Sequence, residues 1–241
     1  MRRYRIEPIT RYVVFPYEDG TLIPAKDFSK RFPNCWAYLK ENRKLLAGRE
    51  NGKMDHEGWY GYVYPKSLRL FGTPKILTPS IANRASFSYD AHGEYYFVGS
   101  GGGGGGGYGI MLKPSDESPL YILGLLNSRL LDFCLKSISS PFRHGYYAYN
   151  KQYIERLAIR RINFDDPADK KRHDAIVKKV EEMLQLQKDY AEAERNLEDR
   201  QHALKRRIEQ VDAAIDRMVY ELYGLTEEEI AVVEGGTGRL R

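Results

Sequence analysis

The longest stretch without a helix-breaking residue constrains this chain most. Residues 168–223 contain neither glycine nor proline, so no residue there interrupts a helix through backbone freedom or a missing amide. Residues at alternating steps of four and three follow the spacing of a heptad seam. The seam runs through Ile176, Val180, Met183, Gln187, Tyr190, Glu194, Leu197, Gln201, Leu204, Ile208, Val211, Ile215, Met218 and Leu222.

Two arrangements satisfy this seam. A single straight helix of this length would extend on the order of 80 Å. The seam turns polar at Gln187, Glu194 and Gln201, so a helical hairpin that turns near residues 192–199 is an equal alternative. The pattern leaves open whether the seam pairs within one chain or between two chains.

Capping residues mark the end of the helical region. Gly224 suits a C-terminal cap, and Thr226 with Glu229 matches a capping box for a short helix over 227–233. We therefore predict a helical region over 161–234, followed by a disordered tail at 235–241.

Residues 1–160 show a shorter, mixed pattern. A stripe at helical spacing within 33–48 predicts a helix, and it comprises Cys35, Tyr38, Leu39, Asn42, Leu45 and Leu46. An apolar stretch predicts a buried helix over 120–135. Aromatic or β-branched runs predict strands at 59–64, 74–79, 94–98 and 108–112. The predicted fold class is α+β, with a mixed-sheet domain over 1–160 before a long helical hairpin or coiled coil.

The charge balance also changes between residues 1–160 and residues 161–241. Residues 1–160 carry 23 Lys and Arg against 14 Asp and Glu, whereas residues 161–241 carry 15 against 19. A basic, tyrosine-rich half suits contact with a polyanion, and an acidic half suits contact with protein. Seven consecutive glycines at 101–107 are either a flexible hairpin tip or a loop whose bare backbone approaches a DNA strand.

The sequence lacks patterns typical of a catalytic or metal site. Cys35 and Cys134 have no Cys or His at ligand spacing, so neither a zinc site nor a disulfide framework is expected. Residues 139–142 are the nearest match to the Asn/Asp/Ser-Pro-Pro-aromatic motif of an amino-methyltransferase, but they lack its first proline. Residues 169–171 match the acidic-x-Lys string of a metal-dependent nuclease, but they lie at the start of a predicted helix, whereas the nuclease string lies on a strand. We expect no catalytic residue, no metal and no cofactor in this chain.

Neither targeting nor membrane insertion is indicated. The N-terminus lacks the apolar run of a signal peptide, and no stretch approaches 18 apolar residues. The absence of a disulfide framework is typical of a reducing compartment. We therefore expect a cytoplasmic location without membrane contact.

Several strings, in order, carry a family resemblance. They are FPYEDG, AYLKENRKLLAGRENGK, WYGYVYPKSL, PKILTPSI, YYFVGSGG, YILGLLNSRLL, YNKQYIERLAI and IDRMVYELYGLTEEEI. Together they resemble the TaqI-like C-terminal specificity domain, which follows the catalytic domain in adenine-specific DNA methyltransferases and in fused restriction–modification enzymes. The strings YILGLLNS and YELYGLT are also similar to those in specificity subunits of type I restriction systems.

The resemblance implies a division of labour. Residues 1–160 would be the DNA target-recognition domain, and residues 161–234 would contact a catalytic methyltransferase domain or subunit. That catalytic domain is not in this sequence, so we expect a non-catalytic specificity part, with S-adenosylmethionine on the missing domain. The expected partners are double-stranded DNA, the catalytic part and, through the helices, a second copy of this chain.

Base reading and phosphate contact require particular side chains. Arg reads guanine, Asn or Gln reads adenine, and Lys or Arg holds phosphates. The strongest candidate segment is FRHGYYAYNK, which places cations, a histidine and tyrosines around Gly145. The predicted DNA-binding residues are Arg43, Arg49, Lys53, Lys66, Lys75, Arg84, Arg143, His144, Tyr146, Tyr149, Asn150 and Lys151.

Three other interpretations compete with this one. A type I-like specificity module would bind DNA but would normally carry a second recognition domain, for which this chain lacks space. A helical protein-interaction protein without DNA binding would show no salt-dependent affinity for a duplex. An endonuclease would need a metal site that the sequence does not supply.

Overall fold

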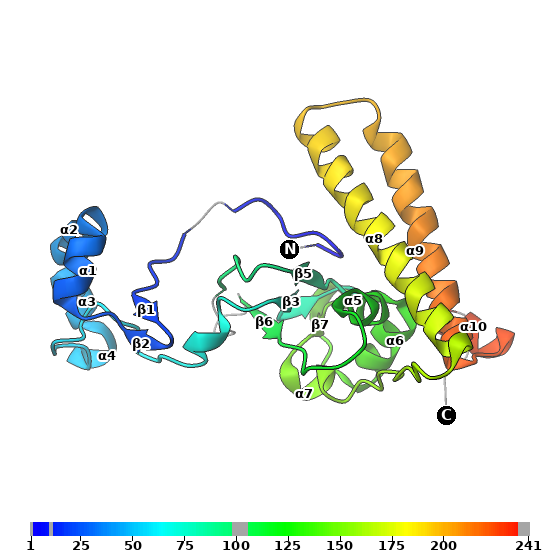
Figure 1. Ribbon diagram of the computed structural model, residues 1–241, viewed down its shortest axis with the longest axis horizontal. Coiled ribbons are helices and arrows are strands. Elements are labelled where there is room, and N and C mark those ends of the chain that lie inside the picture. Colours follow the sequence, from blue (N-terminus) through cyan, green and yellow to red (C-terminus); the bar gives the residue numbers. More distant parts are fainter. Residues whose placement is uncertain (1, 10–11, 98–105, 236–241) are drawn as a thin grey trace. The chain divides into compact units, whose positions relative to one another are not determined.

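The computed structural model describes residues 2–9, 12–97 and 106–235 of the chain (Figure 1). Its contacts divide the chain into two compact units. The large unit comprises Met1–Glu7, Pro74–Ala91 and Phe97–Arg241, and the small unit comprises Pro8–Thr73 and His92–Tyr96. The predicted α+β class is confirmed by helices that alternate with short strands.

The small unit is mainly helical. Its elements are β1 (Tyr17–Glu18), β2 (Thr21–Leu22), α1 (Ala25–Arg31), α2 (Pro33–Glu41), α3 (Arg43–Ala47), α4 (Arg49–Gly52) and the 3₁₀ helix η1 (Leu68–Leu70). The helix expected within 33–48 is therefore present as α2 and α3. Pro33 opens α2 at a position where its missing amide costs no hydrogen bond.

The strand predicted at 59–64 is wrong, because these residues form turns. Trp59 and Tyr60 are buried in the core of the small unit, and their rings pack against Trp36 at centroid distances of 5.6 Å and 5.2 Å. The Arg49 guanidinium donates to the carbonyls of Trp59 at 2.8 Å and Gly61 at 2.9 Å. An arginine thus satisfies carbonyls that a neighbouring strand would otherwise pair.

The sheets of the large unit are small and antiparallel. β3 (Lys75–Pro79) lies between β5 (Ser88–Asp90) and β6 (Gly107–Ile110), with Ile76 opposite Tyr89 on one side and Ile110 on the other. β4 (Ile81–Ala82) pairs with β7 (Tyr147–Ala148). Strands predicted at 74–79 and 108–112 are thereby confirmed, whereas residues 94–97 form no strand.

The helix predicted over 120–135 is two helices, α5 (Pro119–Asn127) and α6 (Arg129–Ile138). Ser128 lies between them in an extended conformation, and its hydroxyl accepts from the Leu131 amide. Asn127, the last residue of α5, is buried. Its side-chain amide accepts from the Phe87 N–H at 3.0 Å and donates to the Phe87 carbonyl at 2.9 Å. A side chain at the end of α5 therefore fastens the start of β5.

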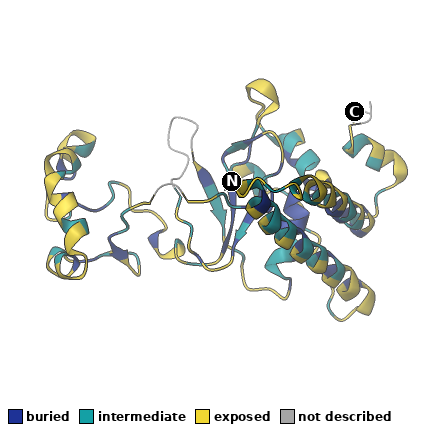
Figure 2. Cartoon of the chain, turned by 90° about the horizontal axis from the view of Figure 1, so that it is seen from above, coloured by how far each residue is buried: buried dark blue, intermediate teal, exposed yellow. Residues whose placement is uncertain are grey.

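The long helical region is a hairpin, which confirms one of the two predicted arrangements. α8 (Pro167–Arg195) and α9 (Gln201–Tyr223) lie side by side with their turn away from the sheets (Figure 1). Buried residues lie between them, and exposed residues cover their outer faces (Figure 2). Ile176, Val180 and Met183 of the seam are buried. Gly224 adopts φ 68° after α9, and the capping box opens α10 (Glu227–Val233) as predicted.

One hydrophobic core joins the sheets, α5, α6 and the hairpin. The close approach of α5 to α8 depends on Gly124, because a Cβ there would lie 2.9 Å from Val180 Cγ2 and 3.1 Å from Ile176 Cγ2. The core therefore continues across residue 160. The expected division of labour at that residue concerns function, and it stays a prediction. Residues 98–105, with most of the glycine run, and residues 236–241 of the expected tail lie outside the described residues.

Charged contacts fasten the N-terminal residues to the hairpin. Arg3 pairs with Asp212 at 2.6 Å, and Arg5 pairs with Glu194 at 3.1 Å. Between them, Tyr4 is buried, and its amide donates to the Phe87 carbonyl at 2.9 Å. These residues therefore hold α8 and α9 against the segment that leads into β5.

Asp216 is a buried carboxylate between α9 and α6. It accepts from the Arg129 amide at 2.8 Å and lies 3.2 Å from Arg129 Nε. Burial raises the pKa of Asp216 from 3.8 to about 6, although the Arg129 amide and Arg3 act in the opposite direction. The folded chain therefore binds this proton more tightly than the unfolded chain does.

We predict that Asp216 reduces stability as pH rises from about 4 to about 6. The folded state holds more protons than the unfolded state in this window, so the free energy of unfolding falls by up to roughly 3 kcal/mol. The Asp216→Asn variant should lack this component, and Asp199→Asn, in the exposed turn between α8 and α9, should keep it. Urea unfolding at a series of pH values measures the difference, and equal pH slopes for all three proteins would contradict the prediction.

Candidate nucleic-acid interface

The predicted DNA-binding residues fall on both units. Arg43, Arg49, Lys53 and Lys66 belong to the small unit, and the remaining eight belong to the large unit. The residues of the small unit and those of the large unit therefore form two separate candidate surfaces.

A short hairpin displays the strongest candidate segment of the large unit. The Phe142 amide donates to the Tyr146 carbonyl at 2.7 Å, and Pro141 forms a bridge with Tyr147. The tip is a 3₁₀ turn, η2 (Arg143–Gly145), in which His144 and Gly145 have φ values of 62° and 73°. Two successive left-handed residues turn the chain sharply, which leaves Arg143 and His144 exposed.

Arg84 follows β4 in the chain. Ala82 of β4 is opposite Tyr147 of β7 in an antiparallel register, and residues 83 and 84 form a bend after the strand ends. Within the described part of the chain, neither Arg84 nor Arg143 has an acidic partner, so both cations are available to an anionic ligand.

Asp132 of α6 holds both segments in place. Its carboxylate accepts from the Ala85 amide at 2.8 Å and from the Tyr149 hydroxyl, and it pairs with Lys136 at 2.7 Å. Tyr149 is fully buried. Its pKa is raised, chiefly by burial and then by the Asp132 charge. A hydroxyl that stays protonated can donate to Asp132 throughout the physiological range.

Two predicted contacts do not reach the surface. Tyr149 is buried, as described, and Lys75 is 2% exposed with its ammonium 2.6 Å from Asp90. Lys75 and Asp90 are opposite each other in the pairing of β3 with β5, so the ion pair crosses the sheet. Both residues are structural here, because burying a charged or polar group requires a partner inside the protein.

Asn150 and Lys151 follow β7. Asn150 precedes the short helix α7 (Lys151–Ile154), and its Oδ1 is buried without a hydrogen-bond partner among the described atoms. Lys151 is largely exposed, and its Nζ lies 3.9 Å from Glu155. Tyr146, which precedes β7, is 41% exposed. Arg84, Arg143, His144, Tyr146 and Lys151 are all exposed and border β4 or β7 in the sequence, and we call these residues the β4–β7 surface.

The small unit supports its cations with aromatic rings. Arg43 lies over Trp59 at 5.5 Å and Lys53 lies over Tyr64 at 4.8 Å, and Lys66 is exposed. Arg49 instead uses its guanidinium on backbone carbonyls. Arg43, Lys53 and Lys66 can therefore meet a ligand, whereas Arg49 has a structural role.

Sequence reasoning missed two exposed apolar residues on this unit. Tyr38 is 60% exposed and Leu45 is 72% exposed, although both belong to the stripe that predicted a core-facing helix. Leu39 is buried and Leu46 is half-buried on the same helices. The stripe is wider than the contact that the small core provides, and sequence spacing alone does not show which edge stays exposed.

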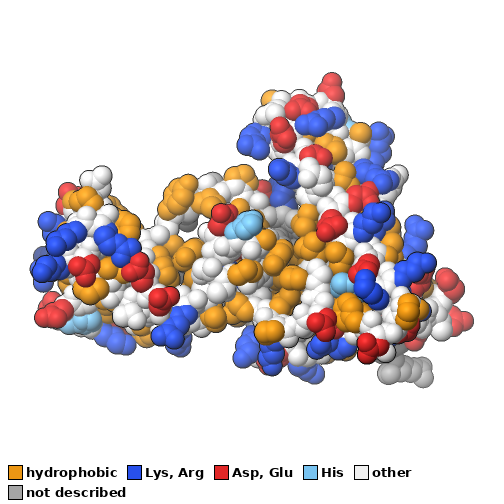
Figure 3. Space-filling view, viewed as in Figure 1, with side chains coloured by type: hydrophobic (Ala, Val, Ile, Leu, Met, Phe, Trp, Pro, Cys, Tyr) orange, Lys and Arg blue, Asp and Glu red, His pale blue; other side chains and the backbone are white. Residues whose placement is uncertain are grey.

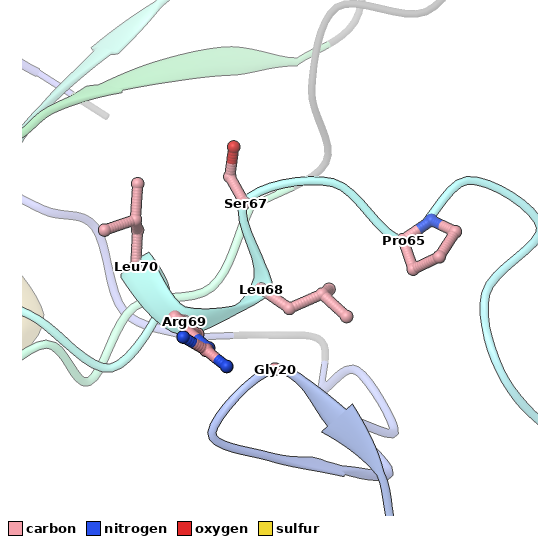
Figure 4. Close-up of a pocket in the computed structure, with 6 residues that line it drawn as sticks. All are labelled: Gly20, Pro65, Ser67, Leu68, Arg69 and Leu70. Atoms are coloured by element: carbon pink, nitrogen blue, oxygen red, sulfur yellow. The ribbon is translucent and has the colours of Figure 1, made fainter.

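Two hollows of the described structure have no arrangement of side chains typical of an active site. One is lined by Gly20, Pro65, Ser67, Leu68, Arg69 and Leu70 (Figure 4). Its cation, Arg69, donates to the Asp19 carbonyl at 2.7 Å. The other lies along α8 and is lined by Pro167, Lys170, Lys171, Asp174, Ala175 and Lys178. Over the described ranges there is no group of three or more His, Cys, Asp or Glu that could hold a metal ion.

In the part of the chain that the structure describes, the helices are either too short or too polar to cross a bilayer.

The chain is similar to one known protein family and to two type II methyltransferases. A family model described as the TaqI-like C-terminal specificity domain matches residues 1–159. The chain is 27% identical to the type II restriction enzyme and methyltransferase RM.Eco57I of Escherichia coli, over 95% of this chain and 23% of that protein. It is 26% identical to the type II methyltransferase M.PaeR7I of Pseudomonas aeruginosa, over 94% and 32% respectively. The chain therefore spans about a quarter to a third of the length of these relatives.

We predict that Tyr149→Phe lowers the free energy of unfolding by roughly 1.5–3 kcal/mol, because it removes a buried hydrogen bond to a charged acceptor. Tyr146→Phe is the matched control, since the Tyr146 ring is partly exposed and its hydroxyl has no partner among the described contacts. Urea unfolding measures both variants. Equal stability of the two would show that Asp132 does not hold the hairpin through Tyr149.

Proposed function

Because the chain belongs to the TaqI-like C-terminal specificity domain family, we propose that it recognises a specific sequence in double-stranded DNA for an adenine-specific methyltransferase of a restriction–modification system. The observation that carries this proposal is the β4–β7 surface, where Arg84, Arg143 and His144 lack acidic partners in the described structure. A hairpin tip with unpaired cations and a flanking tyrosine suits a groove of a duplex.

The proposed contacts divide into reading and anchoring. Arg143, at the tip, would donate two parallel hydrogen bonds from its guanidinium to guanine O6 and N7. Arg84 and Lys151 would hold phosphates, which requires charge without a strict geometry. Tyr146, with its partly exposed ring, would pack against sugar or base edges.

Methyl transfer would belong to a separate catalytic part. We assign S-adenosylmethionine to that part, because the hollows described above lack a catalytic group of side chains. In this division the chain supplies binding energy and position, and the catalytic part supplies the flipped-adenine pocket and the methyl donor. A cytoplasmic location follows from the proposal, since the target DNA is there.

The α8–α9 hairpin is proposed as the contact for the catalytic part. The seam residues of α8 and α9 pack against each other within the chain, so a partner protein would contact the outer faces of the two helices and the turn between them. Leu197, in that turn, is 83% exposed with a φ of 54°. Leu197 would lie in the proposed contact. A second copy of the chain is the alternative occupant, and light scattering of the purified chain separates the two.

The function is tested by fluorescence anisotropy with a randomised duplex pool over a series of salt concentrations, followed by sequencing of the bound fraction. Salt-dependent binding that enriches one motif supports the proposal. Salt-dependent binding without enrichment would mean that the chain anchors DNA but does not read it by itself. Absence of binding at low salt would reject DNA recognition in favour of a protein-interaction role.

We predict that Arg143→Ala weakens binding to the enriched motif by roughly 1–3 kcal/mol and relaxes the preference at one position. A uniform loss across sequences, with the salt slope lowered by about one, would instead make Arg143 a phosphate contact. Arg206→Ala is the control, because Arg206 is exposed on α9 and has no acidic partner among the described contacts. If Arg143→Ala matches this control, Arg143 is not in the interface.

A further inference from the structure

The hydrophobic core reaches only part of the α8–α9 hairpin. Its buried residues end at Met183 on α8 and resume at Val211 on α9. The seam positions between these two residues are half-buried or exposed. They are Gln187, Tyr190, Glu194, Leu197, Gln201, Leu204 and Ile208. We call residues 184–210 the distal part of the hairpin.

Apolar burial holds this distal part less firmly than the rest of the hairpin. Ala193 is buried there, but a methyl side chain removes little apolar area from water. Figure 3 shows Lys and Arg side chains interspersed with Asp and Glu over the turn end of the hairpin. The position of the distal part must therefore depend on polar contacts as well as on packing.

Residues 2–5 supply such contacts at the end of α8. Arg5 Nη2 lies 3.1 Å from Glu194 Oε2, and the Arg5 guanidinium lies over the Tyr190 ring at 5.8 Å. Arg2 Nη1 also lies 3.7 Å from Glu194. We call residues 2–5 the strap, because they cross the distal part from outside the hairpin.

The other side of the strap is fixed to β5. The Tyr4 amide donates to the Phe87 carbonyl at 2.9 Å, and the Ser88 hydroxyl donates to the Arg2 carbonyl at 2.7 Å. The strap therefore connects the distal part to the sheet, in addition to the contact of Arg3 with α9.

The closed strap contains groups that favour its release. Tyr4 has a φ of 60°, in the left-handed region that is unfavourable for a bulky side chain. The Tyr4 hydroxyl and the Nε and Nη1 atoms of Arg5 are buried without hydrogen-bond partners among the described atoms. Water would satisfy these groups if the strap opened. Burial of the Tyr4 ring acts in the opposite direction, so the closed strap is a balance of opposed contributions.

The ion pairs that close the strap are accessible to solvent. The side chains of Arg2 and Glu194 are 59% and 40% exposed, whereas Arg5 is 8% exposed. Dissolved ions screen charges that lie this close to water. Ionic conditions, or a competing charged group, can therefore shift the balance between the closed and the open strap.

We propose that residues 2–5 are a releasable strap that controls the order of the distal part of the hairpin. When it is closed, Arg5 holds the end of α8 through Glu194. When it is open, the end of α8 and the turn with Leu197 move independently of the core. The strap needs neither DNA nor a partner. Only its use, which is to set the conformation that a catalytic part would meet, rests on the proposed function.

Hydrogen exchange followed by mass spectrometry tests the strap on the purified full chain. In Arg5→Gln, the amides of residues 186–195 should exchange on the order of tenfold faster, as expected for the loss of a hydrogen bond to a charged group. The amides of residues 176–183, which the core holds, should be unchanged. Arg195→Gln is the matched control, because Arg195 is exposed beside Glu194 and has no acidic partner among the described contacts. The control should leave both segments unchanged.

Two further measurements show whether the effect passes through the ion pair. Glu194→Gln should reproduce the effect of Arg5→Gln, and the double variant should exchange no faster than the faster single variant, because both changes remove one interaction. Raising the salt concentration from about 0.1 M to about 1 M should speed exchange of residues 186–195 in the unmodified chain and have little effect in Arg5→Gln.

Three outcomes would overturn the strap. One is unchanged exchange of residues 186–195 in both Arg5→Gln and Glu194→Gln. Another is equally faster exchange throughout α5, α8 and α9, which would make residues 2–5 part of one cooperative core. If Arg5→Gln does not fold, the salt series on the unmodified chain decides, and a uniform or absent response is the third outcome. None of these measurements involves DNA, so failure of the strap and failure of the proposed function are distinguishable.

Discussion

The packing of α5 against α8 is the contact on which the large unit depends. Gly124 permits it, because any larger side chain would meet Val180 and Ile176. The two helices share one core with α6, α9 and the strands. The hairpin is consequently part of the body that holds the β4–β7 surface. A protein docked on the hairpin would therefore be positioned relative to that surface by a rigid core.

In each unit, polar side chains with little exposure hold backbone that forms little regular structure. Asp132 gathers the Ala85 amide and the Tyr149 hydroxyl, Asn127 fastens Phe87, and Arg49 binds carbonyls of the turn that contains Trp59. Each takes the place of a strand partner. Short strands and long irregular segments can then be held in defined positions, and exposed cations are displayed on them.

The two candidate surfaces differ in construction. The β4–β7 surface includes a hairpin tip whose shape depends on left-handed residues and on the half-buried carboxylate of Asp132. On the small unit, cations lie over aromatic rings, as Arg43 does over Trp59.

The sequence by itself determined the long helical region, the final helix with its capping box, the helices near residue 40 and the strand β3, whereas it left a straight helix and a hairpin as equal alternatives. These features follow from local rules: heptad spacing, capping chemistry, and apolar runs bounded by proline. The charge division also led to the prediction that the basic part meets DNA. Only the tertiary structure decided that Lys75 and Tyr149 are buried, that residues 59–64 turn, and that Tyr38 and Leu45 are exposed. Burial depends on contacts between residues far apart in the chain, and neither spacing nor residue type specifies which partners are present.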